Sequence, residues 1–91
     1  MIIDCHAHLF PKWIRENRAA HFSLEPAFRL LYESPKSRMA GADGIVSAMD
    51  EDGVDRSVVF GFPWRNLDTC RRHNDYILSV VQKYPHRLSG F

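Results

Sequence analysis

Residues 43–62 have the sequence DGIVSAMDEDGVDRSVVFGF, in which an amphipathic segment runs directly into an apolar one. Ile45, Val46 and Met49 lie at the spacing of one helix face, and Asp43 is placed to cap the start of that helix. The first half of this stretch therefore predicts an amphipathic helix.

The second half of the stretch predicts a buried strand. Gly53 is the residue type that most easily adopts the left-handed conformation at a helix end. Residues 57–62 are then continuously apolar after the first serine and are followed by Pro63. A short apolar run with such boundaries is typical of a strand that is covered on both faces.

The segments before and after residues 43–62 also predict strands and helices. Residues 2–6 begin with β-branched side chains and predict a first strand that ends near His8. A second helix is expected from Thr69, a possible cap, to the residue before Pro85. Residues 87–91 resemble the start of a third strand. The apolar stripe of the second helix comprises Ile77, Val80, Val81 and Tyr84.

The order of these elements predicts an α/β fold. Strands that alternate with helices favour a parallel sheet with right-handed connections. We expect the three strands to be adjacent and parallel, with both helices packed on one side. Cys5 is expected to pack against a helix, and the other residues expected to be largely buried are Val59, Phe60, Ile45, Met49, Ile77 and Val81.

A long connection, from about residue 9 to residue 42, follows the first strand. It exceeds the usual length of a strand-to-helix loop, so we expect it to contain short helices, one opened by Pro11 and another by Pro26. It leaves the carboxyl end of the first strand, where α/β folds place their ligands.

The composition limits the function classes. The chain has 91 residues, 12 basic and 11 acidic side chains and a net charge of +1. This balance argues against nucleic-acid binding. The apolar runs are too short to cross a membrane, and we expect a cytoplasmic protein. Cys5 and Cys70 are expected to be free thiols, because two cysteines define no disulfide framework.

His6 and His8 are the candidate metal ligands. Side chains two residues apart on a strand project to the same face, roughly 6.5–7 Å apart along the chain. Imidazole suits divalent ions of the zinc class better than calcium or magnesium. Asp4, one step earlier on that face, could orient an imidazole by accepting its second N–H. An H-x-H pair also occurs by chance on solvated faces, so the spacing alone leaves both interpretations open.

Other polar and aromatic residues invite weaker hypotheses. Trp64 and Arg65 follow the second strand and are candidate substrate-binding residues, Arg65 through an anionic carboxylate. Surface exposure is an equal alternative for Arg65. His73 lies on the apolar stripe of the second helix and His86 follows Pro85, so both are expected to be structural.

Several ordered motifs resemble one enzyme family. Residues 1–11, MIIDCHAHLFP, resemble the opening of the amidohydrolase superfamily, in its amidohydrolase 2 branch of hydrolases, decarboxylases and hydratases. Residues 49–61, MDEDGVDRSVVFG, are similar to the next helix-strand junction of that branch. Residues 74–77, Tyr84-Pro85 and residues 87–91 are similar to its following helix and third strand.

This resemblance implies a fold, a cofactor and a function. It implies that residues 1–91 are the N-terminal portion of a (β/α)₈ barrel, with a divalent metal, usually zinc, held by His6, His8 and later residues. It further implies a metal-dependent hydrolase, or a non-oxidative decarboxylase or hydratase, that acts on a small carboxylated or cyclic molecule. The catalytic acid or base would lie outside this chain, so the isolated chain is expected to be inactive.

Two alternatives from other classes remain at this point. The chain could be a small α/β scaffold or interaction module without catalytic activity. It could also form homo-oligomers, since an open parallel sheet leaves unpaired strand edges.

Overall fold

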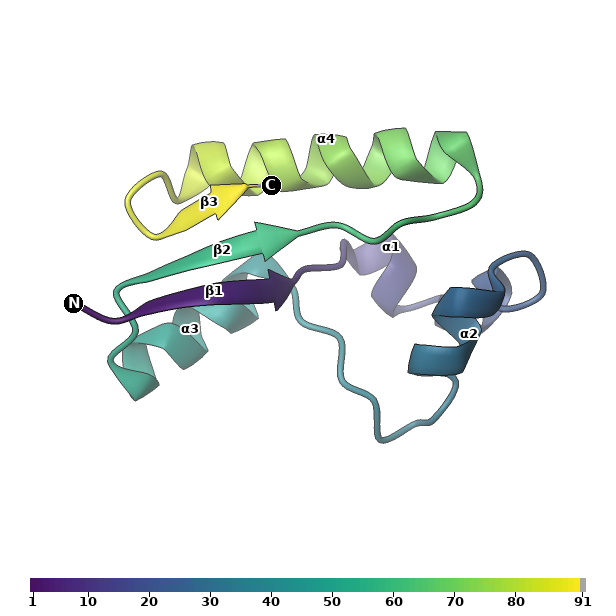
Figure 1. Cartoon of the computed structure of the whole chain (residues 1–91), viewed down its shortest axis with the longest axis horizontal. Coiled ribbons are helices and arrows are strands. Elements are labelled where there is room, and N and C mark those ends of the chain that lie inside the picture. Colours follow the sequence, from purple (N-terminus) through teal and green to yellow (C-terminus); the bar gives the residue numbers. More distant parts are fainter. Residues whose placement is uncertain (91) are drawn as a thin grey trace.

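One parallel sheet organises the chain. The computed structural model describes residues 1–90. The sheet has the order β1-β2-β3, and both strand pairs are parallel (Figure 1). Its strands are β1 (Ile3–His8), β2 (Arg56–Phe60) and β3 (Leu88–Gly90). The three predicted strands and their parallel pairing are confirmed, while Phe91 lies outside the described residues.

Two helices connect the strands and cover one face of the sheet. Helix α3 (Ala42–Asp52) precedes β2, and helix α4 (Leu67–Lys83) joins β2 to β3. A single apolar cluster contains residues of both helices together with residues at the strands, which confirms that the helices share one face. Its buried members are Leu9, Met49, Val59, Ile77, Val80 and Leu88.

The predicted burial is confirmed for Val59, Met49 and Ile77. Ile45 and Val81 are only partly buried, at the margin of the same cluster. Phe60, also expected to be buried, is likewise only partly buried. The prediction for Cys5 is wrong, because its side chain is exposed. Strand β1 is an edge of the sheet, and among residues 1–90 no helix covers this position.

The helix ends differ in part from the prediction. Asp43 lies in the first turn of α3 and does not cap it, because the N-cap residue is Gly41. Thr69 is likewise inside α4, where its backbone N–H is donated to the side chain of Asn66, the true cap. The C-cap prediction holds, since Gly53 has a left-handed φ of 70°.

The long connection contains the expected helical turns. Pro11 is the N-cap of α1 (Lys12–Arg15), and Pro26 is the first residue of α2 (Pro26–Tyr32). A 3₁₀-helix, η1 (Arg18–His21), lies between them. These turns pack around a second cluster of buried residues, Phe10, Ile14, Phe28 and Trp64. None of the helices in residues 1–90 has the length and apolarity that a transmembrane segment requires.

Candidate metal centre

The two predicted metal ligands converge at the carboxyl end of β1. The Nε2 atoms of His6 and His8 lie 2.9 Å apart, and their rings meet edge to face with centroids 4.7 Å apart. His6 is exposed and His8 is half-buried. The pair is therefore accessible and points two nitrogen atoms at one place.

The protonation of His8 follows from its second contact. Its Nδ1 atom lies 2.9 Å from the carbonyl oxygen of Gly61. A carbonyl oxygen only accepts, so Nδ1 must carry a proton, and in the neutral ring Nε2 of His8 then presents a lone pair. His6 then donates its Nε2 proton to that lone pair. Gly61 thus holds His8 in the tautomer that a metal ligand needs.

The spacing of the two nitrogen atoms fits one divalent ion. Two imidazoles on a tetrahedral ion at ~2.0–2.1 Å would place their nitrogen atoms roughly 3.3 Å apart. The observed 2.9 Å is within a few tenths of an ångström of this value. Binding would require His6 to carry its proton on Nδ1. Residues 1–90 contain no group of three or more His, Cys, Asp or Glu side chains arranged around one ion.

Asp4 contacts the backbone of the site. Its carboxylate accepts the backbone N–H of His6 at 3.1 Å. The register between β1 and β2 shifts between Asp4 and Ala7, so strict alternation of side chains fails there. No hydrogen bond in the described part of the chain joins Asp4 to an imidazole. The carboxylate therefore supports the local shape of β1 beside His6.

Phe60 belongs to this site, although its sequence position suggested the core. It pairs with His8 in the sheet register, and its ring centroid lies 4.6 Å from that of His6 and 5.9 Å from that of His8. Alternation along β2 places Phe60 on the face opposite Val59. The two-residue repeat of a strand could have placed Phe60 on this face. Because residues 58–60 are all apolar, however, the sequence does not distinguish the two faces of β2. Phe60 provides an apolar wall beside the imidazoles.

Within residues 1–90, Trp64 and Arg65 make their contacts away from the histidine pair. Trp64 is buried, and its indole N–H is donated to Nδ1 of His73 at 2.8 Å. Arg65 has an exposed side chain, and its backbone N–H is donated to Glu25 at 2.7 Å. No contact within residues 1–90 joins either residue to an imidazole of the pair. Their role in substrate binding remains a prediction.

The comparisons with known proteins give one informative result. No protein-family model and no curated protein matches the chain. Its structure is similar to that of a probable 2-pyrone-4,6-dicarboxylic acid hydrolase from Acinetobacter baumannii, crystallised with citric acid, with a TM-score of 0.58 and 20% identity. The match covers 99% of this chain and 27% of the hydrolase. The chain has an α/β fold that is similar to part of that enzyme's barrel. It spans about a quarter of that enzyme's length.

Glu25 is a structural residue of the site region that the sequence did not reveal. It is buried, and its two carboxylate oxygens accept the backbone N–H groups of Arg65 and Asn66 at 2.7 and 3.1 Å. This contact fastens the long connection to the start of α4. A glutamate before Pro26 is ordinary in a loop, so no sequence signal distinguishes it.

His73 is the most deeply buried histidine, with 1% of its surface exposed, and its predicted position on the buried stripe is confirmed. Its Nε2 atom lies 2.6 Å from the carbonyl oxygen of Leu9. Burial lowers the pKa of His73 below its ordinary value, because the charged ring is unfavourable where water is excluded. His86, by contrast, is exposed.

Proposed function

We propose that this chain is the N-terminal part of a metal-dependent hydrolase barrel and supplies His6 and His8 as two of the metal ligands. The observation that carries the proposal is the convergence of their Nε2 atoms at the carboxyl end of a parallel strand. Ligands of α/β barrels bind at that end. The likeness to a hydrolase supports the proposal at the level of the fold.

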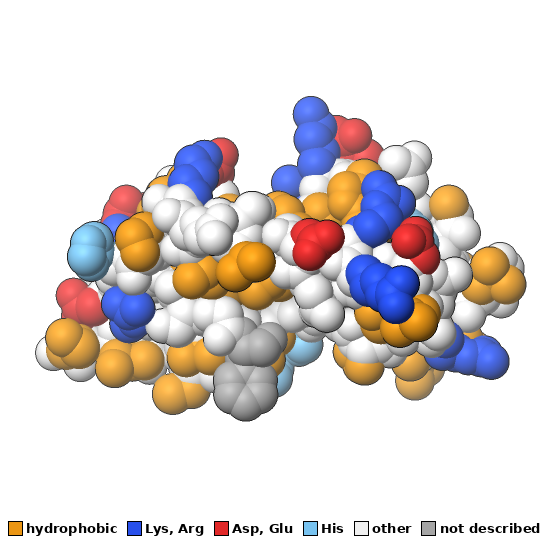
Figure 2. Space-filling model, turned by 90° about the horizontal axis from the view of Figure 1, so that it is seen from above, with side chains coloured by type: hydrophobic (Ala, Val, Ile, Leu, Met, Phe, Trp, Pro, Cys, Tyr) orange, Lys and Arg blue, Asp and Glu red, His pale blue; other side chains and the backbone are white. Residues whose placement is uncertain are grey.

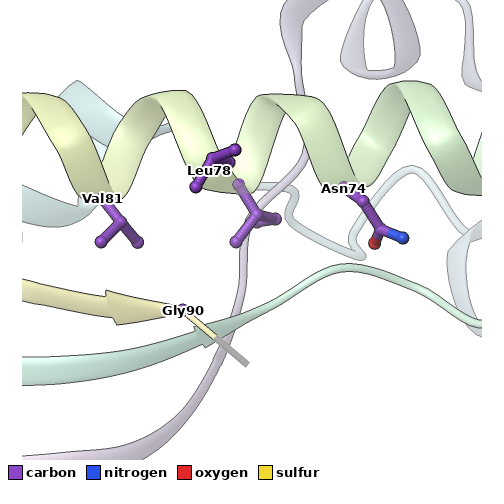
Figure 3. A pocket seen from close by; sticks show the side chains of 5 residues that line it. Asn74, Leu78, Val81 and Gly90 are labelled. Atoms are coloured by element: carbon purple, nitrogen blue, oxygen red, sulfur yellow. The ribbon is translucent and has the colours of Figure 1, made fainter.

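Open surfaces at both sheet edges support the barrel part of the proposal. Ile2 and Ile3, at edge strand β1, are 56% and 50% exposed. Beside β3, the other edge, a hollow of about 420 Å³ is lined by Asn74, Ile77, Leu78, Val81 and Gly90 (Figure 3). Hydrophobic side chains also reach the surface seen from the α4 side (Figure 2). Parallel sheets are normally covered, so we infer that further strands and helices occupy these edges.

The chemistry proposed for the site is that of a divalent ion, with zinc as the first choice. A bound ion would polarise a substrate carbonyl or carboxylate, or lower the pKa of a water molecule. His6 and His8 would hold it, and Gly61 would keep His8 in the required tautomer. Phe60 would exclude water from one side. This arrangement suits a small carboxylated or cyclic substrate and is compatible with hydrolysis, decarboxylation or hydration.

Metal binding by matched histidine variants tests the proposal. Zinc content at equilibrium with buffer that contains zinc, together with cobalt titration, would be compared for the wild-type chain and for His6→Ala, His8→Ala and His86→Ala. The exposed His86 lies outside the site and serves as the control. We expect the first two variants to lose binding and the control to retain it. Equal metal content in all four proteins would refute the proposed site.

A further inference from the structure

We propose that His73 is a positioning residue for His8. The proposal rests on the proposed function, because it concerns the orientation of one of the two metal ligands. His73 lies in the middle of α4, on the opposite side of the sheet from the imidazole pair. It acts through the backbone at the carboxyl ends of β1 and β2.

The protonation of His73 is fixed by its two partners. The indole N–H of Trp64 is only a donor, so Nδ1 of His73 must accept it. The proton of a neutral ring therefore lies on Nε2, which donates to the carbonyl oxygen of Leu9 at 2.6 Å. Both ring nitrogen atoms are satisfied in a site that excludes water. The ring consequently has one orientation and one tautomer.

The ring of His73 binds the backbone just after β1 and lies beside the residue that follows β2. Leu9 directly follows His8, and its own N–H is donated to the carbonyl oxygen of Phe60 at 3.1 Å. Gly61, directly after β2, lies beside the ring, since a Cβ atom added to this glycine would come within 3.5 Å of it. Gly61 is also the residue whose carbonyl oxygen accepts the Nδ1 proton of His8. One ring therefore supports the residue after His8 and the acceptor of His8.

This support has a consequence for the tautomer of His8. The Nδ1 contact with Gly61 favours the lone pair on Nε2 only while the two backbones keep their spacing. Loss of the His73 contact with Leu9 would free the end of β1 to move relative to Gly61. His8 would then populate the tautomer with a proton on Nε2, which cannot bind a metal ion through the nitrogen atom that faces His6.

The test compares His73→Asn with His73→Gln. The asparagine side chain can accept from Trp64 but is too short to reach Leu9, whereas glutamine can place an amide N–H where Nε2 lies. Nitrogen-15 NMR of the histidine rings in the metal-free chain reports the tautomer of His8. Cobalt titration then reports affinity. Gly53→Ala, at the C-terminal end of α3, controls for general destabilisation.

We expect His73→Asn to shift the His8 tautomer and to weaken cobalt binding by about tenfold, and His73→Gln to restore both toward wild type. The Gly53→Ala control should change neither. A folded His73→Asn with an unchanged His8 tautomer would overturn the proposal, as would an equal shift in the control. Because the tautomer is measured without metal, a chain that binds no cobalt but shows the expected shift would refute the proposed function and leave the positioning role intact.

Discussion

The side chains of Trp64 and His73 share a buried hydrogen bond of 2.8 Å, with the indole N–H donated to Nδ1. Protonation of His73 would place a second donor against that N–H. Protonation of His73 should therefore break this hydrogen bond, and the stability of the fold should depend on pH.

We expect the free energy of unfolding to fall as the pH drops below about 6.5, the ordinary pKa of histidine. Burial lowers the pKa of folded His73, so the unfolded chain binds more protons in this range and is favoured. The stabilisation is complete above that pH and is lost as the pH falls toward the lowered pKa. Urea unfolding at pH 5 and pH 7 would measure it.

His73→Gln is the control for this pH dependence, since glutamine does not titrate. The variant should lose less stability between pH 7 and pH 5 than the wild type. A residual loss is expected from His21, whose pKa burial also lowers. An unchanged pH dependence in His73→Gln would contradict the assignment to His73.

A second prediction concerns the carboxylate that fastens the long connection. Glu25→Ala leaves two half-buried backbone N–H groups without their acceptor, which should cost about 1–3 kcal/mol of unfolding free energy. Glu16→Ala removes only an exposed ion pair with Lys12 and should change stability by less than about 1 kcal/mol. Chemical denaturation of both variants would compare them. Equal effects would show that the buried contact is not structural.

The third prediction compares the effect on stability of substituting two glycines, one at the end of α3 and one within it. Gly53 has a φ of 70°, so Gly53→Ala should destabilise the chain by about 1–2 kcal/mol. Gly44 lies within α3 with open space where a Cβ atom would be, so Gly44→Ala should stabilise it by about 0.5–1 kcal/mol. Thermal unfolding would measure both. The same sign for the two substitutions would contradict the assigned backbone conformations.

The fourth prediction concerns the chain in isolation. With only His6 and His8 as ligands from residues 1–90, zinc should bind no more tightly than about micromolar, because catalytic zinc sites usually have three protein ligands. We also expect no turnover of cyclic amides, lactones or aromatic carboxylates in the presence of zinc. Turnover that His6→Ala abolishes would show that the chain alone suffices for catalysis.

The sequence was sufficient to predict the α/β fold because its signals are local. The apolar run ending at Phe60 and the left-handed Gly53 each depend on neighbours along the chain. The pairing of His6 and His8 was predicted from the two-residue repeat of a strand, although the register shift between Asp4 and Ala7 interrupts strict alternation beside His6. These features could be predicted without knowledge of any distant contact.

The remaining features depend on contacts between distant segments. Glu25 is buried because two N–H groups about forty residues away need an acceptor. Cys5 is exposed because β1 is an edge strand, which its own sequence does not reveal. Trp64 donates to His73 although a position after a strand also suits a ligand contact. The position of Phe60 beside the imidazoles can be recognised only from its pairing with His8 in the sheet.

The long separation between β1 and β2 has a consequence for the order of folding. A contact such as that between Ile2 and Asp55 spans 53 residues, whereas the contact between Arg56 and Ser89 spans 33. Closing the longer loop costs more chain entropy, and non-local strand pairing slows folding. We expect β2, α4 and β3 to acquire protection first in pulsed hydrogen exchange, with β1 protected last. The nascent chain would then have no metal site until its slowest pairing is complete.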